Sequence, residues 1–131
     1  MRILFILLLS ILVACSGVKN RTNTDEANVS EVVRTKLAEA REFVRTGQHK
    51  PALAKLSELN DNTITPLEKS LKYNLKGVTL FNFGEVDKAL LNFEVAEKYA
   101  PKDTQLYSQL QLNMASAHYK LGHFSKLKIC L

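Results

Sequence analysis

Apolar and polar positions divide the chain into three zones. Residues 3–12 are apolar except for Ser10, and the apolar run continues to Ala14 and stops at Cys15. Residues 16–28 are rich in Asn, Thr and charged side chains and present no apolar face for a core. From Ser30 onward, apolar residues recur every three or four positions, which is the period of amphipathic helices. We therefore expect a targeting segment, a tether and one helical domain.

Two helices joined by a short turn are predicted between residues 30 and 59. Ser30 is a suitable N-cap for the first helix. Its apolar positions keep helical spacing, at Val33, Leu37, Ala40, Phe43 and Val44. Residues 47–49 break this pattern. A second helix follows over residues 51–59, where Pro51 is tolerated in a first turn.

The next helix has the strongest start signal in the chain. After a predicted loop at residues 60–65, Thr65 is an N-cap, Pro66 takes the first helical position, and Glu68 completes a capping box. This helix is expected to run to about Phe83, where Gly84 ends it.

Three further helices are predicted towards the end of the sequence. One spans residues 85–99 and is stopped by Pro101. Another begins after Asp103 or Thr104 as its N-cap and ends at Gly122, and a sixth begins near Phe124. The order is helix, glycine turn, helix and loop, three times over.

Large, small and turn residues follow a fixed spacing over residues 73–101. They stand at Tyr73, Gly77, Leu80, Gly84, Ala89, Phe93, Ala96 and Pro101. This pattern resembles the tetratricopeptide repeat (TPR), a pair of antiparallel helices. The resemblance implies that Gly77 and Ala89 allow the two helices to approach closely. Lys76 departs from the pattern, because the family usually has Leu there.

The flanking segments repeat the theme less closely. The upstream set is Ala40, Phe43, Gly47, Ala52 and Leu56, and the looser downstream set is Ala115, His118, Gly122 and Leu127. The turn glycines are 37 and 38 residues apart, against about 34 in the family. We therefore expect an all-α, TPR-like solenoid of antiparallel helix pairs over residues 30–131, with about two and a half to three repeats. A generic helical bundle is the alternative.

The N-terminal zone is typical of a secretory signal peptide over residues 1–14. Arg2 supplies the positive end, and the apolar run is too short to cross a bilayer. The sequence Leu-Val-Ala-Cys at residues 12–15 resembles the bacterial lipobox. That resemblance implies cleavage before Cys15, acylation of Cys15 and a tether over residues 15–29. Ser16 after the cysteine favours the outer membrane, facing the periplasm. A plain signal peptide or a buried helix with an accidental cysteine is the alternative.

Charge and reactive residues give no support for an enzyme. The formal net charge of +5 falls to +4 without residues 1–14, too little to indicate nucleic-acid binding. His49, His118 and His123 do not cluster with acids or cysteines at the spacing of metal ligands, and no catalytic motif is present. We expect no catalytic activity, cofactor or metal. Cys130 could be a small apolar residue or form an intermolecular disulfide.

The family resemblance implies a peptide-binding groove lined by the first helix of each repeat. Arg34, Arg41 and Arg45 would share one helical face, which suits an acidic segment, or they could be an ordinary solvated face. The remaining lining residues expected from this mapping are Asn74, Val78, Phe81, Asn82, Asn113, Tyr119 and Lys120, together with Leu37, Val44, Leu71, Gln109, Leu112 and Ser116.

These features favour a membrane-anchored scaffold that binds a protein or peptide partner in the cell envelope, in envelope or pilus and secretion assembly. The last repeat looks incomplete, with residues 124–131 forming about two helical turns. Its end could be frayed, covered by a partner or second copy, or truncated. The alternative function is a structural or regulatory lipoprotein that self-associates through this end, as a homodimer.

Overall fold

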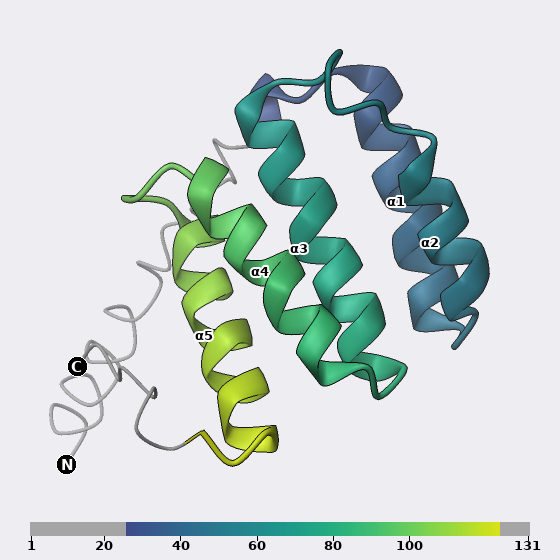
Figure 1. The fold of residues 1–131 in the computed structure, drawn as a ribbon. Coiled ribbons are helices and arrows are strands. Elements are labelled where there is room, and N and C mark those ends of the chain that lie inside the picture. Colours follow the sequence, from purple (N-terminus) through teal and green to yellow (C-terminus); the bar gives the residue numbers. More distant parts are fainter. Residues whose placement is uncertain (1–25, 124–131) are drawn as a thin grey trace, which may run out of the picture.

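The computed structural model describes residues 26–123 as an all-α domain (Figure 1). A 3-10 turn, η1 (Glu26–Asn28), precedes five helices: α1 (Glu31–Arg45), α2 (His49–Ser57), α3 (Pro66–Asn82), α4 (Val86–Tyr99) and α5 (Gln105–Lys120). This part of the chain contains no strand, so the predicted all-α class is confirmed. The signal peptide, Cys15, the predicted sixth helix and Cys130 lie outside the described residues.

The helix starts match the predictions at α3 and α5, and they differ at α1, where the predicted cap makes no bond, and at α2, which spans His49–Ser57 rather than residues 51–59. At α3, Thr65 Oγ1 accepts a hydrogen bond from the Glu68 N–H at 3.2 Å, and Glu68 Oε2 accepts from the Thr65 N–H at 2.8 Å, which is a capping box. Thr104, rather than Asp103, caps α5 by accepting from the Tyr107 N–H. Ser30 occupies the N-cap position of α1, but its side chain makes no capping bond.

α1, α3 and α5 end in the same kind of turn. Gly47, Gly84 and Gly122 have φ values of 74°, 90° and 73°, in the left-handed region that favours glycine. At each turn the glycine N–H and the following N–H donate back to carbonyls in the last helical turn, as in a Schellman motif. Gln48 and Glu85 then share nearly the same backbone angles, so α2 and α4 begin alike.

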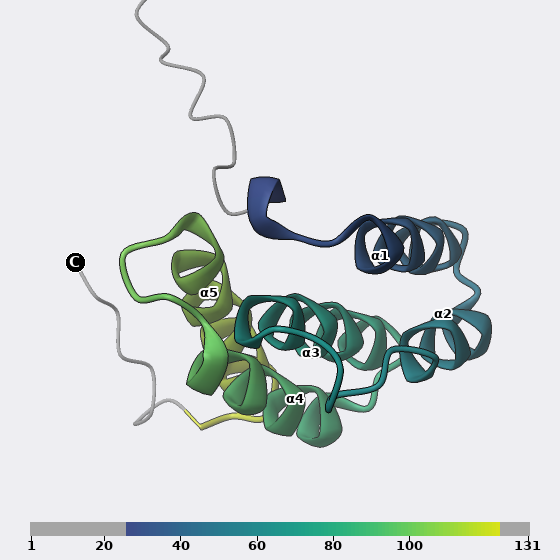
Figure 2. The ribbon, with the colours of Figure 1, turned by 90° about the horizontal axis from the view of Figure 1, so that it is seen from above.

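The helices form two layers. Each helix packs against the next one, and α3 also contacts both α1 and α5. Among the described helices, α2 and α4 make no direct backbone contact. Figure 2 shows α1, α3 and α5 along one side, with α2 and α4 behind them on the other. The side formed by α1, α3 and α5 is called the inner face below.

Two apolar clusters fill the space between the layers. One joins α3, α4 and α5 around Phe93 and Leu110, and the other joins α1 and α2 around Leu37 and Leu56. α3 and α4 approach closely at Gly77, where an added Cβ would lie 2.5 Å from two ring carbons of Phe93. The repeat-pattern residues Gly77, Ala89, Phe93 and Ala96 are all buried.

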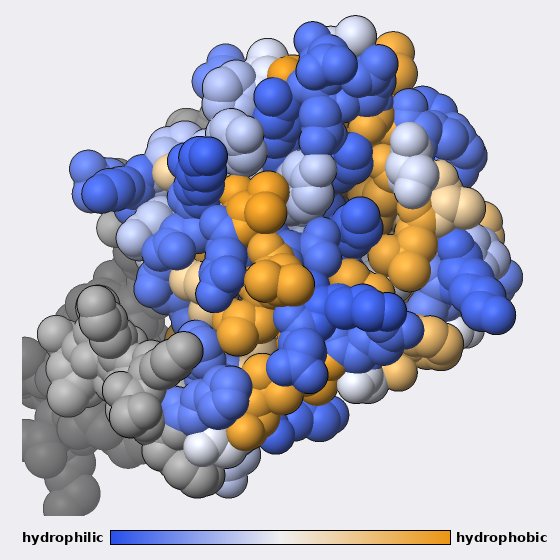
Figure 3. Space-filling view, in the orientation of Figure 1, coloured by the Kyte–Doolittle hydropathy of each residue, from blue (hydrophilic) through white to orange (hydrophobic). Residues whose placement is uncertain are grey.

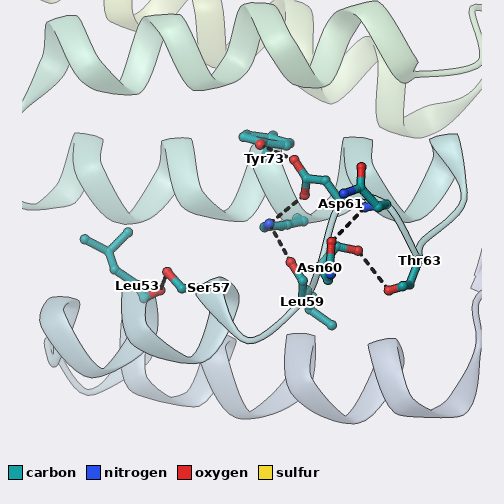
Figure 4. A network of polar contacts seen from close by, with 9 residues as sticks. Leu53, Ser57, Leu59, Asn60, Asp61, Thr63 and Tyr73 are labelled. Carbon is teal, nitrogen blue, oxygen red and sulfur yellow. Dashed lines mark hydrogen bonds and ion pairs between the residues drawn. The ribbon is translucent and has the colours of Figure 1, made fainter.

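A polar network fixes the loop between α2 and α3 (Figure 4). The buried Lys72 Nζ donates to the Leu59 carbonyl at 2.7 Å and to Asp61 Oδ1 at 2.6 Å, and the Tyr73 hydroxyl donates to Asp61 Oδ2. Burial raises the pKa of Asp61, but the bonds from Lys72 and Tyr73 outweigh it and leave the pKa lowered. The bond to Asp61, with burial, raises the pKa of Tyr73 to about 12.

Candidate functional site

All the residues predicted to line a groove lie on α1, α3 and α5, the three helices of the inner face. The structure brings together those on α3 and α5. A pocket of about 220 Å³ opens between these helices and is lined by Val78, Phe81, Asn82, Phe93, Asn113 and Ser116. Five of these six residues are from the predicted groove lining. The sixth, Phe93, comes from α4 and was expected only as a packing residue.

A chain of amides frames the pocket. Gln109 Nε2 donates to Asn113 Oδ1 at 3.1 Å, and Asn113 Nδ2 donates to Asn74 Oδ1 at 2.9 Å. This chain runs along α5 and crosses to α3. Because amides both donate and accept hydrogen bonds, the polar groups beside the pocket suit the backbone of an extended peptide.

A cationic side chain, Lys120, lies beside the pocket near the end of α5. Lys120 Nζ stands 5.0 Å from the centroid of the Phe81 ring, a cation–π distance. Tyr119 is exposed on the same helical turn. Val78, Phe81 and Phe93 thus give the pocket an apolar surface, while Asn82, Asn113 and Lys120 supply polar groups around it.

The three arginines of α1 are not one uniform basic stripe. Arg45 pairs with Glu42 through two hydrogen bonds, of 2.9 and 2.6 Å. Arg34 pairs with Glu31 at 3.0 Å and also donates to the Val29 carbonyl at 3.1 Å. The charges of Arg34 and Arg45 are therefore matched by acids of the same helix, which weakens their attraction for an acidic segment.

Residues 26–30, called the strap below, lie on the α1–α3 half of the inner face. Val29 is only 7% exposed and packs in the cluster that contains Val33 and Leu37. With Arg34, Leu37, Arg41 and Leu71, it also lines a small pocket of about 30 Å³. The tether predicted for residues 15–29 therefore ends earlier, because an apolar side chain at 29 belongs to the core.

Glu68 holds the strap. The residue is 3% exposed, and its carboxylate accepts the Ser30 N–H on Oε1 at 2.7 Å, in addition to the Thr65 N–H on Oε2. Burial raises the pKa of Glu68, but the bonds from Ser30 and Thr65 outweigh it and leave the pKa lowered. The sequence predicted the capping box but not the bond to Ser30. The position of Val29, four residues before Val33, was the one available signal.

The histidines are spread over different contacts. His49 lies beside Phe83, with ring centroids 5.3 Å apart, and His118 lies beside His123 across the Gly122 turn at 5.8 Å. Within residues 26–123, no group of three or more His, Cys, Asp or Glu side chains could hold a metal ion. Among the described residues, the α3–α5 pocket is where most of the predicted groove residues of α3 and α5 come together.

Comparison with protein-family models, curated proteins and solved structures finds no match to this chain. No helix within the described range is both long and apolar enough to cross a bilayer.

Proposed function

We propose that this protein is a lipid-anchored envelope adaptor without enzymatic activity, which holds an extended segment of a partner protein on the inner face of a TPR-like solenoid. The recurring glycine turns support the solenoid, because they reverse the chain identically after α1 and after α3. The contacts of α3 with both α1 and α5 support it further, since stacked helix pairs bring their first helices together.

The α3–α5 pocket is the observation that carries the proposal. Its volume of about 220 Å³ suits one apolar side chain of a partner. The amides of Asn82 and Asn113 lie beside it and can bond the partner backbone on either side of that residue. Apolar anchors in pockets with polar rims are the usual energetic centre of such interfaces.

Site-specific photocrosslinking tests the groove. A photoreactive residue replaces Ser116, which lines the pocket, and in a matched variant it replaces Ser108, two turns away on α5. The full chain is expressed in its native host, and crosslinked proteins are identified by mass spectrometry. We expect one dominant partner from position 116 that is absent from position 108. Equal labelling from both positions, or none from either, would refute groove binding.

The lipid anchor is proposed from the lipobox-like residues 12–15, which lie outside the described range. Several acyl chains on Cys15 would give stable attachment, whereas a single chain gives only marginal binding. Metabolic labelling with a palmitate analogue tests this in wild type and Cys15→Ala. Label that persists in the variant would show that Cys15 is not the modified residue.

A further inference from the structure

A group of lysines lies around two tyrosine rings on the side of α3 away from the inner face. Lys69 Nζ and Lys98 Nζ stand 5.2 and 5.9 Å from the centroid of Tyr99, and Lys76 Nζ stands 5.8 Å from that of Tyr73. We call Lys69, Lys76 and Lys98, together with these two rings, the lysine face. Lys72 also lies by Tyr73, but its charge is matched by Asp61.

The lysine face keeps its positive charge. Within residues 26–123, no carboxylate forms an ion pair with any of its three lysines. The charge of Lys69 also acts on Asp61, but that carboxylate is already held by Lys72 and Tyr73. Glu94 and Asp103 are exposed acids on α4 and in the following loop, and neither pairs with these lysines.

Helical geometry separates the lysine face from the pocket. At about 100° per residue, Lys69 and Lys76 fall on one side of α3, whereas Asn74 and Val78 fall on the opposite side. The two surfaces can therefore be occupied at the same time.

Exposed apolar residues continue the lysine face along α4. Leu91 is 61% exposed and Val95 is 37% exposed, and their spacing of four and three places them on one helical face with Lys98. Figure 3 shows apolar and polar side chains alternating over α4 on this side of the molecule. Lysine, tyrosine and exposed aliphatic side chains thus meet on a single surface.

We propose that the lysine face docks the domain onto an anionic membrane surface. Its ammonium groups lie at two places, Lys69 and Lys98 by Tyr99 and Lys76 by Tyr73, rather than all at one point, which suits several headgroups better than a single phosphate. Leu91 and Val95 need an apolar phase that a purely acidic peptide would not provide. Lysine and tyrosine both have apolar bodies with polar tips, which suits the headgroup boundary.

The path of the chain is compatible with this orientation. The strap lies on the inner face, on the opposite side of α3 from the lysine face, but Glu68, which holds the strap, and Lys69 both lie at the N-terminal end of α3. A lipid on Cys15 would hold this end of the domain near the bilayer. In this respect the inference rests on the anchor of the proposed function. A domain docked in this way would present its α3–α5 pocket away from the membrane, towards a partner.

Tryptophan fluorescence tests the docking. The chain has no Trp, so Val95→Trp introduces a single reporter on the lysine face, and Val32→Trp on α1 is its control. The lipidated full chain is reconstituted with brominated lipids, in phosphatidylcholine alone or mixed with phosphatidylglycerol. We expect quenching of Trp at position 95 only in the anionic vesicles, declining as salt is added, and no quenching at position 32.

Charge variants make the test specific. Lys69, Lys76 and Lys98 are changed to Gln together in the Val95→Trp background, and a matched variant carries Gln at Lys36, Lys50 and Lys120. The first set should abolish the quenching and the second should retain it, with both folded by circular dichroism. Equal quenching in neutral vesicles, or quenching that survives the first set, overturns the proposal. So does protection of the three lysines by soluble polyglutamate without quenching, which would assign the face to an acidic protein.

Vesicle flotation distinguishes a failure of the membrane docking from a failure of the lipid anchor. Chain that floats with neutral and anionic vesicles but is never quenched at position 95 retains its anchor and lacks the docking. Chain that floats only with anionic vesicles and is quenched there lacks a working anchor but supports the docking. Photocrosslinking from position 116 reports on the pocket independently of both results.

Discussion

The two halves of the inner face share α3 as their central helix, but a segment of the chain itself covers only one of them. Beside α1, the strap covers α3: Val29 enters the core, and Glu68 binds the Ser30 N–H. Beside α5, α3 lines an open pocket with amides around it. The α1–α3 half is therefore occupied by the strap. The α3–α5 half also combines apolar and polar side chains, but no segment among residues 26–123 covers it.

The strap shows how this face can hold a short segment of chain, through Val29 and the extended backbone of Ser30. The Val29 side chain is buried, the Val29 carbonyl accepts from Arg34, and the Ser30 N–H donates to Glu68, so two backbone groups next to the buried side chain have partners on the domain. The pocket offers an apolar floor at Phe93 and Val78, with the amide of Asn113 nearby. By analogy, the partner segment should bring one aliphatic residue flanked by free backbone groups.

The largest expected effect comes from filling the close approach beneath the pocket. In Gly77→Ala, the new Cβ would meet the Phe93 ring at 2.5 Å, so the ring must move towards the pocket that it lines. We expect the free energy of unfolding to fall by about 3 kcal/mol. Urea denaturation followed by circular dichroism measures this.

A second substitution identifies the cause of that loss. Phe93→Leu shortens the facing side chain, so the double variant Gly77→Ala/Phe93→Leu should be more stable than the sum of the two single changes predicts. Strict additivity would mean that the ring does not oppose the new methyl group.

The next largest effect on stability concerns the α1–α3 half of the inner face, which the strap covers. Glu68→Ala removes the acceptor for both the Ser30 and the Thr65 N–H groups, which leaves two donors near the core without a protein partner. We expect a loss of about 2 kcal/mol in the free energy of unfolding. Hydrogen exchange should rise over residues 26–34 and stay unchanged over α5. Equal increases in both regions would mean that Glu68 supports the whole domain rather than the strap.

The stabilisation by Glu68 should depend on pH. Because its pKa is lowered in the folded protein, the carboxylate contributes stability above its unfolded pKa of about 4.3, and this contribution is lost as the pH falls through the folded value. Glu68→Gln should therefore be less stable than wild type at neutral pH and converge towards it below about pH 4. Thermal unfolding across this range measures the difference, and a constant gap at every pH would contradict the assignment.

Much of this architecture could be read from the sequence because its signals are local. The capping box at Thr65, the turn glycines and the apolar spacing depend on residues within a few positions of one another. The strap could not be placed in this way, because the bond from Ser30 to Glu68 joins residues 38 positions apart. Likewise, the sequence placed Asn74 and Asn113 on the correct helices, but only packing determines that they bond to each other.

The smallest expected effect on stability should accompany a large effect on binding. Asn113→Ala removes the amide bond to Asn74, but both side chains are partly accessible to water, so unfolding should change by less than about 1 kcal/mol. Crosslinking from position 116 should nevertheless be lost, because the polar group beside the pocket is gone. Gln109→Ala is the matched control: it also removes a bond to Asn113, yet it does not line the pocket, so crosslinking should persist. If both variants keep the crosslink, the α3–α5 half does not use its amides to recognise the partner. The analogy between the bound strap and the partner segment would then be wrong.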